Sequence, residues 1–166
     1  MSFIGIIANS KNFEGIKQYL YHQQKEKAYQ IIHINSKSIE NVKHVKFDVI
    51  IITCSFENIL PQKQMVEKLC LGAKYLILNA DSFIPLEFFK KEKITIITYG
   101  LNQKSTVTIS SINEENALIA LQRSFKNIAG EEIEMGEKSL ELDENHKLSP
   151  QDILVVAIIF LIYPEK

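Results

Sequence analysis

The feature that most constrains the fold of this chain is a series of short aliphatic runs separated by polar segments of helix length. Five runs have this character, at residues 3–8, 29–34, 47–53, 75–78 and 94–98. The third run is almost continuous Val and Ile, which is typical of a strand buried on both faces of a parallel sheet. Between the runs lie segments with helical patterns, including one that begins near Pro61 and stops at Gly72 and a short one at residues 85–91. The alternation predicts an α/β fold with a mainly parallel sheet flanked by helices.

The pattern changes after Gly100. Residues 106–112 alternate polar and apolar side chains, which predicts a strand at the edge of the sheet with one face in water. Residues 116–125 fit either a helix or a strand. Residues 133–142, with Gly136 between them, resemble a bent hairpin. We therefore expect an antiparallel extension of the sheet in the C-terminal third.

The last segment predicts a helix that is apolar on every side. Ser149 is a typical N-cap, Pro150 fits the first helical position, and Asp152 adds a negative charge to the first turn. Such a helix must be covered by its own domain or by another copy of the chain. We expect a homodimer through this helix or a protein partner, and we expect Ile159 to face outward. The apolar run at residues 153–163 is about half the length of a membrane span.

Length and charge narrow the function classes. At 166 residues the chain has room for a single α/β domain, residues 1–166, with P-loop or Rossmann-like layering. Its net charge of −1 gives no electrostatic case for nucleic-acid binding. No signal peptide is visible, and Cys54 and Cys70 are widely spaced, so we expect a cytoplasmic protein with reduced, buried cysteines.

The first strand-to-helix turn lacks the phosphate-binding pattern that this layering often carries. Residues 8–15 hold one lysine, Lys11, and no glycine before the helix, so neither the P-loop nor the dinucleotide motif fits. Lys11 at a helix N-terminus is a tentative anion contact, and a solvated turn lysine is the alternative. The histidines are unpaired in spacing and predict no zinc site: His22, His33, His44 and His146.

The ends of the predicted parallel strands carry the best candidate binding residues. Thr53 follows the third run, Asn79 and Asp81 follow the fourth, and residues 98–100 follow the fifth. In an open parallel sheet, ligands bind beyond the carboxyl ends of the strands. Asn can bond an adenine-like edge and Asp can accept from ribose hydroxyls. The alternative is that Asn79 and Asp81 shape the loop and cap the following short helix.

Two further interpretations concern catalysis and cofactors. Cys54 sits at the end of the third run and is a possible nucleophile, although no partner base is recognisable in the sequence. No metal cluster and no catalytic triad are evident, so we expect no bound cofactor, with ATP or another nucleotide as the alternative.

Three of these segments together resemble the central, ATP-binding domain of the Mur ligases, which join amino acids to peptidoglycan precursors. They are residues 47–53, which end in Thr53, the Leu-Asn-Ala-Asp segment at residues 78–81, and the Ile-Thr-Tyr-Gly segment at residues 97–100. Their order and spacing agree over residues 45–112. In that family the Asn-x-Asp segment lies at the nucleotide, so the resemblance implies nucleotide contacts for Asn79 and Asp81.

The departures from the family pattern bear on mechanism. The glycine-rich P-loop is missing, and Cys-Ser-Phe-Glu replaces the family's histidine after the third strand. We also expect no separate precursor-binding or amino-acid-binding domain. Phosphoryl transfer depends on positioned cations and phosphate-cradling amides. The sequence therefore favours a non-catalytic Mur-ligase-like binding or regulatory module, which the resemblance would link to cell-wall metabolism. A small-ligand binder that uses Asn79 and Asp81, and an enzyme that uses Cys54, are the alternatives.

Overall fold

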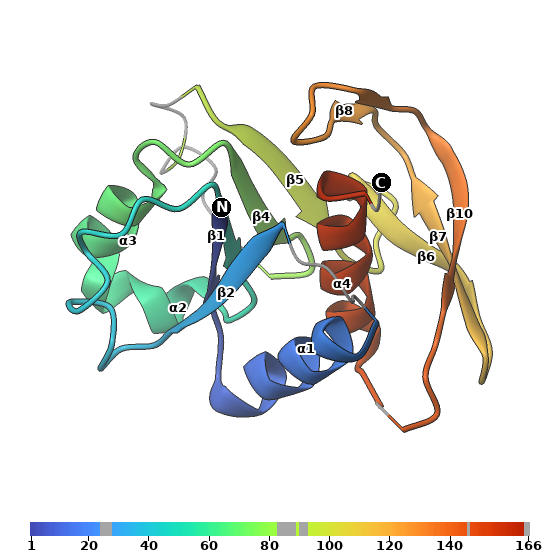
Figure 1. The fold of residues 1–166 in the computed structure, drawn as a ribbon, viewed down its shortest axis with the longest axis horizontal. Coiled ribbons are helices and arrows are strands. Elements are labelled where there is room, and N and C mark those ends of the chain that lie inside the picture. The colour runs from blue at the N-terminus through green and yellow to red at the C-terminus, as the bar shows by residue number, and fades with distance from the viewer. Residues whose placement is uncertain (24–27, 83–88, 90–92, 146, 165–166) are drawn as a thin grey trace.

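One eight-stranded mixed sheet organises the chain (Figure 1). The computed structural model describes residues 1–23, 28–82, 89, 93–145 and 147–164. Across the sheet the strands follow the order β10-β7-β6-β5-β4-β3-β1-β2. The bounds are β1 Ser2–Ile7, β2 Tyr29–Ile34, β3 Val49–Ile52, β4 Tyr75–Asn79, β5 Thr95–Tyr99, β6 Val107–Ile112, β7 Asn116–Leu121 and β10 Gly136–Glu141. The predicted α/β fold is confirmed.

The five aliphatic runs form the parallel half of the sheet. Strands β2, β1, β3, β4 and β5 are all parallel to their neighbours, and every residue of β3 is buried. This burial explains the unbroken Val and Ile of that strand, because both of its faces are covered. The chain order reverses between β1 and β3, with β2 on one side of β1 and β3 on the other. This half of the sheet therefore has a topological switch point at the carboxyl ends of β1 and β3.

The antiparallel extension is also present, although its details differ from the sequence expectations. β6 joins β5 in parallel through the pair Tyr99 and Val107, and β7 and β10 then continue the sheet in antiparallel fashion. The prediction that residues 106–112 form an edge strand is wrong, because β7 and β10 lie beyond β6. The segment left open between helix and strand is strand β7.

The hairpin expected at residues 133–142 does not form. β9 (Glu132–Ile133) pairs with β8 (Phe125–Lys126) in a separate two-stranded sheet, whereas β10 pairs with β7. Gly136 stands where the chain passes from one sheet to the other, with a φ of 141°, a conformation that side-chain-bearing residues rarely adopt. Gly136 therefore separates the β8–β9 pairing from the β10–β7 pairing and does not form the turn of a hairpin.

Helices cover the two faces of the parallel half and build two cores. The helical bounds are α1 Ser10–Gln23, α2 Phe56–Ile59, the 3₁₀ turn η1 Leu60–Gln62, α3 Lys63–Cys70 and α4 Pro150–Ile162. One core contains α1 and α4, and the other contains α3 with the segment that leads into β3. Pro61 lies in η1, one turn before α3 begins, and Gly72 ends that helix region with a φ of 82°. The short helix predicted at residues 85–91 falls mostly outside the described residues.

Helix α4 is covered by its own chain. It contacts α1 and strands β5, β6 and β7, and in Figure 1 it lies between α1 and the curved β6–β7–β10 part of the sheet. Ile159 is fully buried, so the expectation that it faces outward is wrong. The apolar surface of α4 thus gives no reason to invoke a second copy. Among the described residues, no helix has both the length and the apolarity to cross a bilayer.

Candidate functional site

The predicted site residues lie at one edge of the sheet, which we call the carboxyl edge: Lys11, Thr53, Asn79 and Asp81. Thr53 directly follows β3, Asn79 ends β4, and Lys11 stands in the first turn of α1, just after β1. Because β1, β3 and β4 are parallel neighbours, their carboxyl ends meet at this edge. The sheet therefore brings the strand-end positions to a common edge, as the sequence predicted.

Asp81 fastens the loop after β4 to the loop after β5. Its Oδ2 accepts from the backbone N–H of Leu101 at 2.8 Å, and its Oδ1 accepts from Nδ2 of Asn102 at 2.9 Å. Gly100 lies directly beneath this carboxylate: a Cβ at that position would stand 2.6 Å from Oδ1. The close approach explains the glycine at the end of β5, since any side chain there would displace Asp81.

Asn79 and Thr53 also bond within the chain. Oδ1 of Asn79 accepts from the N–H of Asp81 at 2.9 Å, which forms an Asx turn. The backbone N–H of Ala80 donates to the carbonyl of Tyr99 at 2.7 Å, so the turn is held against β5. The Thr53 hydroxyl donates to the carbonyl of Ile7 at 3.2 Å and ties β3 to β1. The loop-shaping role considered for Asn79 and Asp81 is therefore real.

The N-termini of α1 and α4 meet on the α1–α4 face of the sheet. Nδ2 of Asn12 donates to both carboxylate oxygens of Asp152, at 3.2 and 3.1 Å. Asp152 is buried in the first turn of α4, where Ser149 caps the helix by accepting from the Asp152 N–H at 3.2 Å. A carboxylate is stabilised here by the positive ends of both helix dipoles. Lys11, by contrast, is exposed.

The surroundings of Tyr99 and Cys54 do not activate either side chain. Burial raises the pKa of the Tyr99 hydroxyl well above its usual value, and the nearby Asp152, Cys54 and Asp81 raise it further. Burial likewise raises the pKa of the Cys54 thiol. Reactive cysteines have a lowered pKa, because the thiolate is the nucleophile. The surroundings of Cys54 therefore favour the inert thiol.

The prediction that both cysteines are buried holds for Cys70 only, because Cys54 is half-buried. Both cysteines are free thiols, Cys70 is buried, and burial raises its pKa to about 12. His33 lies in edge strand β2, stacked on Phe13 at 4.4 Å between ring centroids, and bonds the carbonyl of Ala8 at 2.8 Å. In the part of the chain that the structure describes, no group of three His, Cys, Asp or Glu side chains is placed to hold a metal ion.

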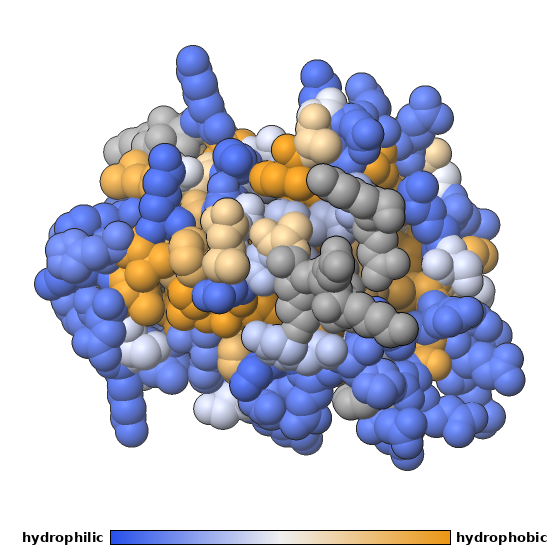
Figure 2. Space-filling view, in the orientation of Figure 1, coloured by the Kyte–Doolittle hydropathy of each residue, from blue (hydrophilic) through white to orange (hydrophobic). Residues whose placement is uncertain are grey.

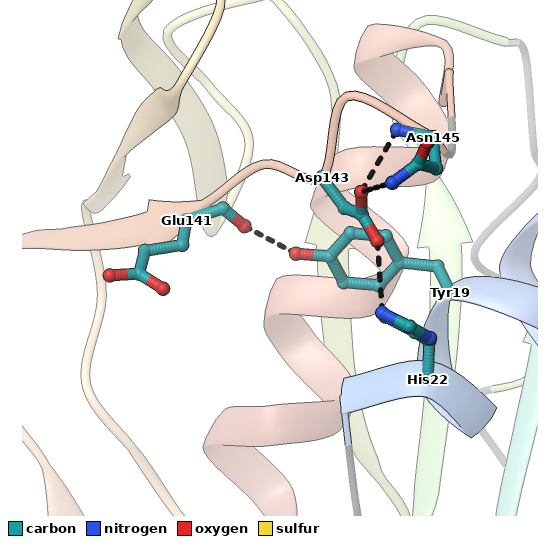
Figure 3. Close-up of polar contacts among 5 residues, drawn as sticks. All are labelled: Tyr19, His22, Glu141, Asp143 and Asn145. Carbon is teal, nitrogen blue, oxygen red and sulfur yellow. Dashed lines mark hydrogen bonds and ion pairs between the residues drawn. The ribbon is translucent and has the colours of Figure 1, made fainter.

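A second polar cluster, shown in Figure 3, was not anticipated from the sequence. The Tyr19 hydroxyl donates to the carbonyl of Glu141, and Nε2 of His22 lies 3.4 Å from Oδ2 of Asp143. Oδ1 of Asp143 accepts from the N–H and Nδ2 of Asn145 at 2.9 and 3.0 Å. Burial, Asp143 and Glu141 together raise the pKa of Tyr19.

This cluster fastens the end of α1 to the segment between β10 and α4. The Tyr19 hydroxyl bonds a backbone carbonyl 122 residues along the chain, so no local pattern in the sequence could have revealed the contact. A histidine paired with a carboxylate can serve as a general base. Here, however, His22 is largely exposed, with 62% of its side chain accessible, and the contacts hold two elements together.

No protein-family model matches the chain, and a search of curated proteins finds no match.

Proposed function

We propose that this chain is a non-catalytic, Mur-ligase-like binding or regulatory module connected with cell-wall metabolism. The proposal rests on the hydrogen bonds that the side chains of the carboxyl edge make within the chain. Asp81 bonds Leu101 and Asn102, Asn79 bonds the Asp81 backbone, and Thr53 bonds the carbonyl of Ile7. Side chains that would position a nucleotide in a ligase are engaged in holding loops and strands together.

The sequence resemblance supports the same proposal. It covers residues 45–112, which correspond to the stretch from β3 to β6, and its three motifs end at the carboxyl edge. The turn between β1 and α1 has no glycine with which to bring backbone amides close to phosphates. The carboxyl edge has strand ends that resemble those of the family, but it lacks a phosphate-binding loop. Such an edge is better suited to binding than to phosphoryl transfer.

Phosphate release tests the non-catalytic part of this proposal. Purified protein incubated with ATP and Mg²⁺, with and without amino acids, should release no phosphate above the buffer rate. ATP hydrolysis that persists through purification and is abolished by Asp81→Asn would contradict the proposal. Turnover that is unchanged in Asp81→Asn would come from a contaminating ATPase, so the variant serves as the control.

A second candidate function is binding of a nucleoside or sugar nucleotide. It is favoured by Asn79, whose Nδ2 makes no hydrogen bond within the described residues, and by the exposure of Asp81. A nucleotide at about 100 times its Kd would stabilise the fold by about 2.7 kcal/mol and raise Tm by roughly 5–10 °C. Thermal unfolding with millimolar ATP, ADP, UDP and a UDP-sugar measures this shift.

The variant Asn79→Ala identifies the site in the same assay. It should remove the shift, whereas Gln64→Ala, on the exposed surface of α3, should retain it. If none of the nucleotides changes Tm, the nucleotide function is rejected and the binding-module proposal stands without it.

A further inference from the structure

Strand β2 forms an open edge of the sheet. It is the last strand in the sheet order and pairs with β1 alone in the described part of the chain. Its sequence, Tyr-Gln-Ile-Ile-His-Ile, has no charged residue and no proline. Edge strands normally carry such residues, because unpaired N–H and C=O groups invite another strand.

The other edge of the same sheet is protected. β10 is exposed along most of its length and presents Glu137, Lys138 and Glu141, and it begins at Gly136. Charged side chains on an edge strand oppose pairing with a second chain. Of the two edge strands of this sheet, β10 therefore has protecting charges and β2 has none.

The hydrogen bonds to β1 fix which backbone groups of β2 face outward. The carbonyls of Ala28 and Ile34 accept from the N–H groups of Ser2 and Ala8, at 3.2 and 3.4 Å. Since alternate residues of a strand turn to the same neighbour, Gln30 and Ile32 also turn to β1. Ile31 and His33 therefore direct their backbone N–H and C=O groups to the open side.

Two isoleucines and a packed histidine lie at the centre of this edge strand. Ile31 and Ile32 are half-buried on opposite faces of the strand, and His33 is fixed by its stacking on Phe13. In the space-filling view, apolar side chains form patches interspersed with polar ones on the face toward the viewer (Figure 2). Strand addition would thus bury apolar surface as well as backbone groups.

We propose that two copies of this chain associate through β2, in an antiparallel pairing about a two-fold axis at Ile32. In that register Ile31 of one copy faces His33 of the other, so the outward-facing residues pair with one another. Each such pair exchanges two hydrogen bonds, and the two symmetry-related pairs together form four. The two Ile32 residues face each other as a non-hydrogen-bonded pair, whose Cα atoms are about 4.5 Å apart in a regular ladder.

A second copy fits this edge because the strand is complementary to itself. The same two residues supply donors and acceptors on both sides of the axis, as an isologous interface requires. An uncharged strand also places no like charges opposite each other, which would destabilise such a pairing. This interface uses a different surface from α4, which is buried within the monomer.

Light scattering and a cysteine crosslink test the proposal. At about 100 µM, well above a micromolar Kd, the wild type should scatter as twice the 19.1 kDa chain. Ile32→Cys should form a disulfide dimer under mild oxidation, because a Cα separation of about 4.5 Å lies within the disulfide range. Gln64→Cys on α3 is the matched control and should stay monomeric on a non-reducing gel.

Ile31→Pro tests the register separately. It removes an outward N–H without removing a hydrogen bond to β1, so it should yield a folded chain of 19.1 kDa with the circular dichroism of the wild type. Ile32→Lys, which places like charges opposite each other, should do the same if the proline variant does not fold. A monomeric wild type, or a dimer that both variants retain and that Ile32→Cys does not crosslink, would overturn the proposal.

Discussion

The contact between Gly100 and Asp81 shows how one residue at the carboxyl edge constrains another 19 positions away. The Asp81 carboxylate bonds Leu101 and Asn102, and in this position it leaves room at residue 100 only for the hydrogen atom of a glycine. The sequence pattern correctly predicted both residues at strand ends, because aliphatic runs that stop abruptly mark those ends. It could not assign their partners, since the bonds join loops that are distant along the chain.

Gly100→Ala should lower the free energy of unfolding by about 1–3 kcal/mol, because its Cβ would displace the Asp81 carboxylate and break both of its bonds to the β5–β6 loop. Urea unfolding measures the change. Gly15→Ala is the control: it lies inside α1, its Cβ would stand 3.6 Å from Leu148, and it should raise stability by up to about 1 kcal/mol. Equal effects from the two variants would contradict the assigned contact.

Asp48 makes the stability of the fold depend on pH at the opposite edge of the sheet. Burial alone would raise its pKa, but the hydrogen bond from Lys74 at 3.1 Å, the Phe3 N–H, the Lys74 charge and Ser2 together hold the pKa below the usual 3.8. A lowered pKa means that the stabilisation is complete above about pH 4 and is lost as pH falls through the folded-state value.

Asp48→Asn should therefore cost about 1 kcal/mol at pH 7, and the difference from the wild type should shrink steadily below about pH 4. Urea unfolding at several pH values between 2 and 7 measures this. Glu57→Gln, at an exposed carboxyl of α2 without an ion pair in the described residues, should follow the wild type throughout. A difference that is constant with pH would contradict a role for the Asp48 charge.

At the scale of elements, the sequence predicted strands better than their pairing. The aliphatic runs had to be strands of a covered sheet, since their short, β-branched sequences bury both faces. The pattern of residues 116–125 could not decide between helix and strand, because β7 alternates only between buried and half-buried positions and shows no wet face. The hairpin prediction failed since pairing of β10 with β7 depends on contacts far from Gly136.

Helix α4 was recognised as apolar on every side, and the sequence left open what covers it. The curved extension of the sheet supplies the cover, so Ile159 belongs to the core. Ile159→Ala should destabilise the chain by about 2–5 kcal/mol, as deletion of a buried aliphatic side chain does, without changing its molecular mass in solution. Gln64→Ala, exposed on α3, should leave stability within about 0.5 kcal/mol of the wild type. If Ile159→Ala changed the molecular mass in solution and left the stability unchanged, α4 would instead take part in a contact between chains.

At the scale of the whole molecule, one sheet divides the interior into two separate cores. The core around α3 is built on the parallel strands and the segment before β3, whereas the core around α4 extends from β1 to the antiparallel strands. The carboxyl edge lies where both cores end. Asp81 and Asn79 hold its loops through hydrogen bonds within the chain.

The position of α4 in the chain has a consequence for synthesis. α4 comes after every described strand, yet it fills the centre of the larger core. A nascent chain that has not reached Pro150 therefore carries a sheet with one apolar face open to water. Closure of the larger core must therefore wait until this helix has been synthesised, which at about 5–20 residues per second takes roughly 8–30 seconds after β1. During that interval the uncovered face is available to chaperones and to neighbouring nascent chains.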